Sequence, residues 1–273
     1  MKVEHVVAAY FSATGNTEKV TMTVAKRVAV ELAAPLRRVN LTFPSVRKAP
    51  FDIPENSVLV MGFPVYAGRL PNLLLEYVSN IKGSNVIGVP IVTYGNRSFD
   101  DGLIELRNLM ENGGIKTISA GAFVGEHAFS QILAKGRPDV DDLRLADELG
   151  HKTASLIKSG WEHKGPVKVE GQDPVRPYYQ PRDRHGAPID IRKVKPVTTA
   201  GACVDCKLCA IICPMGSINH ENVFETPGIC IKCCACEKNC PTGAKHFDDA
   251  GYLYHMRELE DVFSRWAESV VFV

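Results

Sequence analysis

The sequence has no excess of charge of either sign, no long apolar run and, in its first 202 residues, no cysteine. Its 32 Lys and Arg residues nearly balance 31 Asp and Glu residues, which leaves a formal net charge of +1. Proteins that bind nucleic acid through the phosphate backbone need surplus positive charge, so we expect no nucleic-acid partner. A bilayer span needs about 20 consecutive apolar residues, and we expect no membrane span either.

The amino-terminal segment is not typical of a secretory signal. Glu4 and His5 interrupt its apolar run, and no small-residue cleavage site follows. A chain that is not exported stays in a reducing compartment, where cysteines act as ligands rather than forming disulfides. We therefore expect a cytoplasmic protein.

Apolar, β-rich segments alternate with amphipathic segments through residues 1–159. The predicted strands are Val3–Phe11, Arg37–Leu41, Ser57–Phe63, Asn85–Thr93 and Lys116–Val124, and helices are predicted from about Thr17 and over about Asn72–Ser79, Asp100–Asn112 and Asp139–Ser159. This alternation predicts an α/β fold with a doubly wound, five-stranded parallel sheet. Ligands of such sheets bind outside the carboxyl ends of the strands.

Two further segments are neither strand-rich nor cysteine-rich. Residues 160–196 contain six prolines and eight basic against five acidic residues, which predicts an extended linker lying along the domain surfaces. A basic docking segment is the alternative. Residues 256–273 predict a C-terminal helix over Met256–Val270, whose apolar face packs on a domain or, alternatively, binds a partner.

All nine cysteines lie between Cys203 and Cys240, and eight of them form a repeat displaced by 27 residues. Each copy reads C-x-x-C-x-x-C-x-x-x-C-P. Three closely spaced thiolates can hold three corners of an iron–sulfur cubane, and the fourth, before a proline, reaches the other cluster. The first predicted [4Fe–4S] ligand set is Cys203, Cys206, Cys209 and Cys240, and the second is Cys230, Cys233, Cys236 and Cys213.

Zinc is the alternative ligand of C-x-x-C pairs, but a zinc site needs neither the third regularly spaced cysteine nor the trailing Cys-Pro. The ninth cysteine, Cys234, has no place in the pattern and is predicted to be a small buried side chain. The pattern resembles the bacterial-type ferredoxin over about residues 198–250. That resemblance implies a small α+β domain with two [4Fe–4S] clusters at residues 197–255.

A candidate phosphate site, Ser12-Ala13-Thr14-Gly15-Asn16-Thr17, stands between the first predicted strand and its helix. Unpaired N–H groups and the helix dipole favour an anion at such a position. The loop has no lysine and no G-x-G-x-x-G pattern, which disfavours a nucleotide triphosphate or a dinucleotide. A phosphate monoester fits better, and an ordinary helix cap is the alternative.

Two more loops leave the same edge of the sheet, Gly62–Gly68 and Thr93–Asp100, and each carries an aromatic residue and glycines. A planar ring could be held between them. With these loops, residues 1–159 resemble a flavodoxin with FMN, and the whole chain resembles the flavodoxin–ferredoxin fusion proteins of anaerobes. The alternative is a flavodoxin-like fold that has lost its flavin.

The flavodoxin resemblance implies an FMN site on all three loops. Phosphate ligands would be Ser12, Thr14, Gly15, Asn16 and Thr17; one side of the isoalloxazine ring would contact Pro64, Val65, Tyr66 and Gly68, and the other Thr93, Tyr94, Gly95, Asn96 and Phe99. Two residues depart from the family, because Phe99 stands where a tyrosine usually stacks and Asn96 replaces a common aspartate. Asn96→Asp is therefore expected to lower the hydroquinone potential.

Glu126 and His127 follow the fifth predicted strand, so they lie at the same edge. They are low-rank catalytic candidates, since a lone histidine on a loop is commonly a capping residue. The sharper hypothesis is that their loop, which is longer than a usual strand-to-helix turn, closes over the flavin or contacts the ferredoxin domain.

These features favour an electron-transfer flavoprotein that passes electrons between two [4Fe–4S] clusters and FMN and on to redox partner proteins, namely ferredoxin- or flavodoxin-dependent enzymes. An alternative is an FMN oxidoreductase that converts a small molecule, with the clusters as its electron supply and Glu126 and His127 as its proton source. A third is an iron–sulfur sensor without redox function, which predicts a protein free of FMN. The sequence leaves the oligomeric state open.

Overall fold

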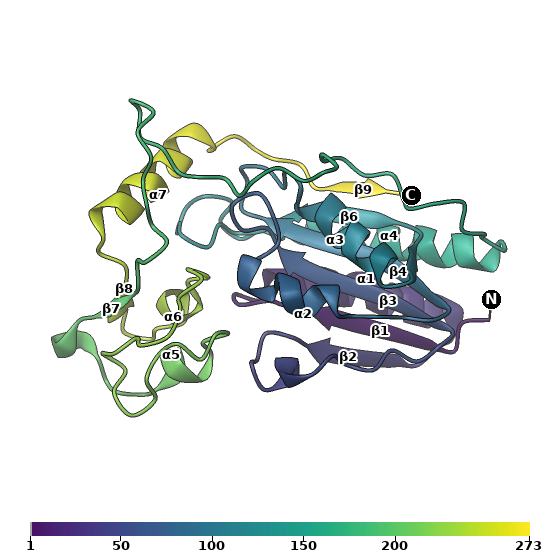
Figure 1. The fold of residues 1–273 in the computed structure, drawn as a ribbon, viewed down its shortest axis with the longest axis horizontal. Coiled ribbons are helices and arrows are strands. Elements are labelled where there is room, and N and C mark those ends of the chain that lie inside the picture. Colours follow the sequence, from purple (N-terminus) through teal and green to yellow (C-terminus); the bar gives the residue numbers. More distant parts are fainter. Residues whose placement is uncertain (1) are drawn as a thin grey trace.

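The computed structural model of the chain describes residues 2–273. Its apolar segments form parallel strands whose residues are buried on both faces of one sheet, as in β3 and β4, because helices cover each face. The strands are β1 His5–Tyr10, β2 Leu36–Asn40, β3 Ser57–Pro64, β4 Val86–Tyr94, β5 Ile115–Thr117, β6 Ala120–Val124 and β9 Val270–Phe272 (Figure 1).

The sheet runs in the order β2-β1-β3-β4-β6-β9, and β5 pairs with β4 beside β6. The order from β2 to β6 is that of the flavodoxin-like doubly wound fold, so the predicted α/β fold is confirmed. Its strand count is corrected. The fifth predicted strand is divided at Ile118 and Ser119 into β5 and β6, and β9 adds an antiparallel edge strand to β6.

Helices α1 Asn16–Leu32 and α4 Val140–Lys158 cover one face of the sheet, and α2 Leu75–Ser79 and α3 Gly102–Asn112 cover the other. The repeat of Val20, Val24 and Val28 buries one side of α1 against the sheet. Helix α4 begins with a capping box in which the Asp139 carboxylate accepts the N–H groups of Asp141 and Asp142. The loops after β1, β3, β4 and β6 therefore leave one edge of a rigid layer.

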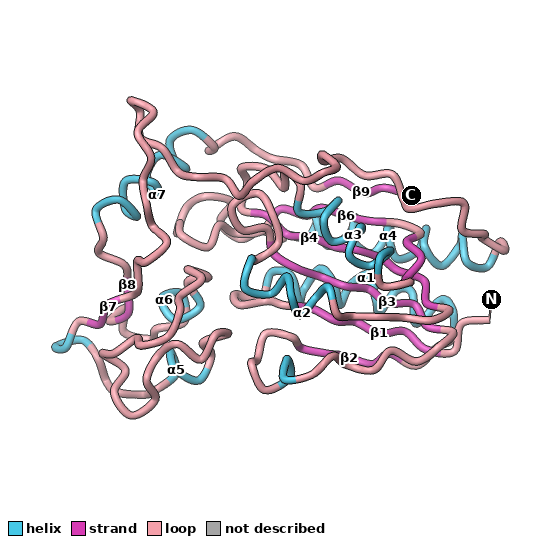
Figure 2. The backbone as a smooth tube through the Cα atoms, in the orientation of Figure 1, coloured by secondary structure: helices cyan, strands magenta, loops and turns pink. Residues whose placement is uncertain are grey.

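The cysteine region, residues 197–255, lies beyond that edge (Figures 1 and 2). It has little regular structure: β7 Val197–Thr198 pairs with β8 Lys245–His246, and the short helices are α5 Leu208–Ile211 and α6 Ala235–Lys238. Single-turn 3₁₀ helices lie at Val46–Lys48, Asn72–Leu74 and Ala200–Ala202.

The linker, residues 160–196, follows the surface of the sheet domain. Its main anchor is buried Asp101, whose carboxylate accepts the backbone N–H groups of Gln172 (2.9 Å) and Arg176 (2.8 Å) and the Arg176 guanidinium. The Tyr178 hydroxyl donates to the Leu70 carbonyl at 2.8 Å. These bonds give an extended segment a defined path to the cysteine region.

The predicted tail helix is wrong in both bounds. Helix α7 spans Ala250–Val262 and begins early because the Asp249 carboxylate accepts the Tyr252 N–H at 2.9 Å. It ends at Val262, and the chain then returns to the sheet, where Val270–Phe272 form β9. Among residues 2–273, none of the helices combines the length and the apolarity that a membrane crossing requires.

Candidate functional site

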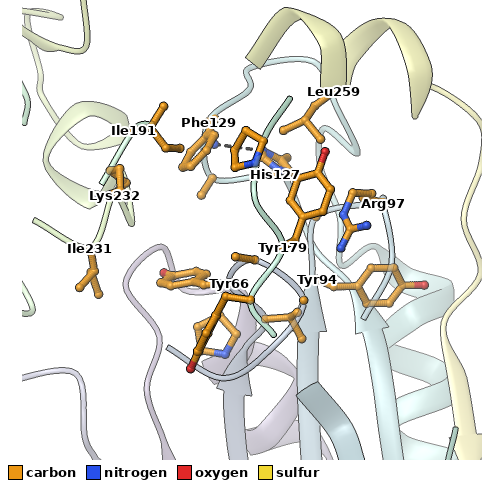
Figure 3. Close-up of a pocket in the computed structure, with 18 of the residues that line it drawn as sticks. Tyr66, Tyr94, Arg97, His127, Phe129, Tyr179, Ile191, Ile231, Lys232 and Leu259 are labelled. Atoms are coloured by element: carbon orange, nitrogen blue, oxygen red, sulfur yellow. Dashed lines mark hydrogen bonds between the residues drawn. The ribbon is translucent and has the colours of Figure 1, made fainter. Parts of the chain in front are cut away.

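A cavity of about 600 Å³, which we call the main cavity, lies where the sheet edge, the linker, the cysteine region and α7 meet (Figure 3). The loops after β1, β3, β4 and β6 form one side of it, as expected for a doubly wound sheet. Linker residues 178–181 and 189–192, residues 229–232 and two residues of α7 form the rest. Three separate parts of the chain thus complete one ligand-sized space.

The predicted phosphate loop lies at one end of the main cavity, where Thr14, Asn16 and Thr17 line the wall. Gly15 caps α1 with a φ of 91°, a left-handed conformation that glycine adopts without strain. Ser12 does not line the cavity, because its hydroxyl accepts the Glu18 N–H at 3.0 Å. The remaining N–H groups of the first turn have no intrahelical acceptor, which makes this end suited to an anion.

Most of the predicted ring-binding residues also line the main cavity, namely Pro64, Val65, Tyr66, Gly68, Thr93, Tyr94 and Gly95. Two do not. The buried Asn96 amide donates to the carbonyls of Phe263 (2.6 Å) and Arg265 (2.7 Å) and so anchors the segment after α7. Phe99 instead packs on Tyr94, with ring centroids 5.5 Å apart.

Glu126 connects the phosphate loop to the cysteine region. Its carbonyl accepts the Asn16 amide N–H at 3.2 Å, and its carboxylate pairs with the Lys238 ammonium of α6. Lys238 also donates to the Ser130 carbonyl at 2.9 Å. Burial raises the pKa of Glu126, but the Lys238 ammonium, the Gly136 N–H and the charge of Lys135 together outweigh burial and lower this pKa overall.

His127 lines the main cavity beside Gly95, to which its ring lies so close that a side chain there would collide with it. Burial, and then the charges of His255, Lys238 and Arg97, lower the pKa of His127 to about 3. Its Nδ1 accepts the Phe129 N–H at 3.1 Å, drawn as a dashed line in Figure 3. The neutral ring therefore carries its proton on Nε2, where it can donate to a ligand.

Sequence reasoning missed the linker and α7 as parts of the cavity. Tyr179 of the linker stacks on His255 of α7 with centroids 6.1 Å apart, and the Arg97 guanidinium lies 4.7 Å from the centre of the Tyr179 ring. No local pattern marks these residues, because their positions depend on the long-range anchor at Asp101.

The cysteine repeat is also a structural repeat. Helices α5 and α6 are displaced by 27 residues, as are three pairs of left-handed residues: Asp205 and Lys232, Lys207 and Cys234, and Gly216 and Gly243. Backbone conformation is thus reproduced at the turns that present the thiols. Cys234 is buried against Ile191, Phe247 and Tyr252, as predicted for the ninth cysteine.

The second predicted ligand set surrounds a small cavity of its own. Cys213, Cys230, Cys233 and Cys236 all line it, together with Pro196, Ile218, Phe247 and other mostly apolar residues. Burial, and then the nearby thiols of Cys230 and Cys213, raise the pKa of Cys233 to about 12. The Sγ atoms of Cys213 and Cys230 accept N–H groups at 3.3 and 3.4 Å. Such bonds stabilise thiolate ligands.

The first predicted set is less enclosed. Cys203 and Cys209 pack with Ile218 and Val223, whereas Cys206 is exposed. Burial raises the pKa of Cys240 less than the N–H groups of Lys245, Thr242 and Ala244 lower it. Within residues 2–273, no three His, Cys, Asp or Glu side chains converge as single-ion ligands. A cubane is larger and holds its ligands at four separate corners.

The two cavities share a wall. Ile229, Cys230 and Ile231 line both cavities, so one cysteine of the second set also borders the main cavity. Burial, and then Cys233, Cys234 and Cys230, raise the pKa of Tyr66, whose ring is directed toward Ile231 in Figure 3. A ligand in the main cavity would thus lie next to the second cysteine set.

Comparison with solved structures finds flavodoxins. An archaeal flavodoxin is 14% identical, with 56% of this chain and 99% of that chain covered and a TM-score of 0.40. A flavodoxin of Streptococcus pneumonia TIGR4 is 16% identical (55% and 97% covered, TM-score 0.38), and oxidised Flavodoxin 1 of Bacillus cereus is 14% identical (56% and 98% covered, TM-score 0.41). No protein-family model and no curated protein matches the chain.

Proposed function

We propose that this chain is an electron-transfer flavoprotein that binds FMN in the main cavity and two [4Fe–4S] clusters in the cysteine region. The observation that carries the proposal is the shared wall: Cys230 borders both the main cavity and the cavity of the second cysteine set. Electrons can then pass within one chain, without diffusion of a separate donor.

The residues that line the main cavity suit a flavin mononucleotide. Thr14, Asn16 and Thr17 would hold its phosphate at the start of α1, and the loops that carry Tyr66 and Tyr94 would hold its ring. FMN exchanges one or two electrons, whereas a [4Fe–4S] cluster exchanges one at a time. The role of the protein is to place both groups on opposite sides of Cys230 and to exclude water between them.

Anaerobic purification with iron and flavin analysis tests the cofactors, and roughly eight irons and one FMN per chain are expected. Photoreduction of the flavin followed by absorbance then tests the transfer. The cluster absorbance should bleach at a rate that is independent of protein concentration. A protein with clusters but without FMN would refute the proposal and favour an iron–sulfur sensor, and a concentration-dependent rate would refute transfer within one chain.

One observation supports an FMN oxidoreductase as the second candidate. His127 lines the main cavity as a neutral ring with its proton on Nε2, next to linker and α7 residues that a small molecule could contact. Steady turnover of a small acceptor without a protein partner, lost in His127→Ala at unchanged FMN content, would favour this function. We place either activity in the cytoplasm, with ferredoxin- or flavodoxin-dependent enzymes as partners of the electron carrier.

A further inference from the structure

The 27-residue repeat allows the surroundings of the two cysteine sets to be compared position by position. The second repeat uses one of its faces to meet the flavodoxin-like domain: Ile231 and Lys232 line the main cavity, and Lys238 pairs with Glu126. The fold of the first repeat presents the equivalent positions in the same backbone conformation.

The equivalent positions of the first repeat are open to solvent. Val204 corresponds to Ile231 and is 65% exposed, and Ile211 corresponds to Lys238 and is 58% exposed. Cys206 is exposed, whereas its counterpart Cys233 is buried. The first repeat thus exposes one cysteine and two large apolar residues at positions that are covered or polar in the second repeat, and exposed apolar residues that gather in one region indicate an interaction site.

Phe224, which is 48% exposed, completes this surface. Val204, Ile211 and Phe224 are the chain neighbours of Cys203, Ala210 and Val223, which pack together in one small apolar cluster. The backbone at Val204, Ile211 and Phe224 therefore lies close to the first cysteine set, and all three side chains are exposed. We call Val204, Cys206, Ile211, Glu221 and Phe224 the outer face.

The charge of the outer face is negative. Residues 203–229 contain the acids Asp205, Glu221 and Glu225 against one lysine, Lys207. That lysine is engaged within the loop, by Asp205 at 2.8 Å and by the Glu221 carbonyl at 2.8 Å. The Glu221 side chain is 95% exposed. In the second repeat the position of Asp205 is occupied by Lys232, so the two repeats carry opposite charges at this position.

We propose that the outer face is the docking site of a redox protein whose own cofactor is rimmed by basic residues. This protein contacts the first repeat in the way that the flavodoxin-like domain contacts the second. The inference rests on the proposed function, since the first cluster must exchange electrons for the contact to matter. Electrons would then pass between the partner and FMN by way of the first cluster and then the second.

The test uses the full chain loaded with FMN and clusters, reduced anaerobically, with two oxidants in stopped flow. Cytochrome c is the basic protein probe, and ferricyanide is a small anion that needs no docking surface. Glu221→Lys should slow cytochrome c reduction about tenfold at low ionic strength, and this difference should largely vanish at high salt. Ferricyanide reduction should stay unchanged or rise, because a repulsive charge has been removed.

Two matched controls carry equivalent changes on α4, far along the chain from the cysteines. Glu148→Lys reverses an exposed acid, and Val140→Ser removes an apolar side chain that is 77% exposed, as Ile211→Ser does on the outer face. Ile211→Ser should slow cytochrome c reduction, while Val140→Ser should not.

Equal slowing by Glu148→Lys, or no slowing by Glu221→Lys and Ile211→Ser, would overturn the outer face as a docking site. Slowing of ferricyanide in parallel would also overturn it, because that result indicates a damaged cluster. Iron and flavin content and the internal transfer rate are measured on the same samples. If the unmodified protein shows no electron transfer between FMN and the clusters, the proposed function is refuted. If that transfer is intact but substitutions on the outer face leave cytochrome c reduction unchanged, only this inference is refuted.

Discussion

Asn96→Asp should have one effect if residue 96 lies beside the flavin, as the sequence predicts, and another if it anchors the tail, as in the structure. If residue 96 lay beside the flavin, a new carboxylate would oppose an anionic reduced flavin and lower its potential. The structure instead directs the Asn96 amide to the carbonyls of Phe263 and Arg265. An aspartate cannot donate to either oxygen, and its charge would face two carbonyl dipoles in a buried site.

The expected cost follows from those two bonds. Each carbonyl that loses its partner costs about 1–3 kcal/mol, so the loss of both bonds should destabilise the tail by about 2–6 kcal/mol. The effect should be local, since Asn96 bonds to the segment that leads into β9. Opening of that segment should become about 30-fold or more easier, because 1.4 kcal/mol corresponds to a factor of ten.

Hydrogen exchange with peptide-level mass spectrometry measures this opening directly. Peptides that cover residues 263–273 should lose protection in Asn96→Asp, whereas peptides from β3 should keep it. Asn80→Asp is the control, because the Asn80 amide donates to the Glu76 carbonyl at an exposed position. A lowered flavin potential together with an unchanged exchange pattern would refute the role of Asn96 as the anchor of the tail.

Three further predictions concern the contacts around the main cavity. Asp101→Ala frees the Arg176 backbone and side chain and should speed FMN release about tenfold or more, as measured by the recovery of flavin fluorescence on dilution; unchanged release would show that the linker does not retain FMN. Lys238→Met leaves the Glu126 carboxylate unpaired and should slow electron transfer between FMN and the clusters, as measured by flash photolysis. The double variant Lys238→Met/Glu126→Gln should regain part of that rate, because the unpaired charge is gone. If the two substitutions slow the transfer additively, Glu126 and Lys238 do not act as a direct pair. The pKa of His127 is about 3 in the folded chain and about 6.5 in the unfolded chain, so between these pH values the unfolded chain binds more protons. The free energy of unfolding should therefore decrease as the pH is lowered through this window, by up to about 1.4 kcal/mol per pH unit. The slope of the urea midpoint with pH should be smaller in His127→Asn, and an equal slope would mean that this ring is protonated in the fold.

Local patterns predicted the sheet domain well. Strand β3 was expected at Ser57–Phe63 and spans Ser57–Pro64, and α4 was expected at Asp139–Ser159 and spans Val140–Lys158. Continuous apolar runs and helical periodicity carry this information within one segment. Most of the predicted FMN loops also line the cavity, because the carboxyl ends of parallel strands necessarily meet at one edge.

Long-range pairing was not predictable in the same way. Strand β9 forms because Val270–Phe272 pair with the open edge of β6, whereas the sequence predicts a helix up to Val270 and no strand after it. Likewise, nothing in the linker sequence indicates that its residues 178–181 complete a cavity whose nearest loop in the sequence, Gly125–Phe129, ends 49 residues earlier. The flavodoxin resemblance places Asn96 and Phe99 beside the flavin, whereas in the structure the Asn96 amide bonds to the tail, Phe99 packs on Tyr94, and neither residue lines the main cavity.

The repeat supplies two equivalent sets of cysteines, and their surroundings have diverged, which under the proposed function would give them different tasks. Cys233 is buried, Lys238 is paired with Glu126, and Ile231 lines the main cavity, so the second set faces inward. At the matching positions of the first set, Cys206 and Ile211 are exposed. In the proposed function, a symmetric pair of clusters would have no preferred direction of electron transfer, whereas this arrangement would place one cluster next to the flavin and leave the other for a partner. Exchanging Ile211 and Lys238 between the repeats should therefore impair both the internal and the external transfer, while leaving the iron content unchanged.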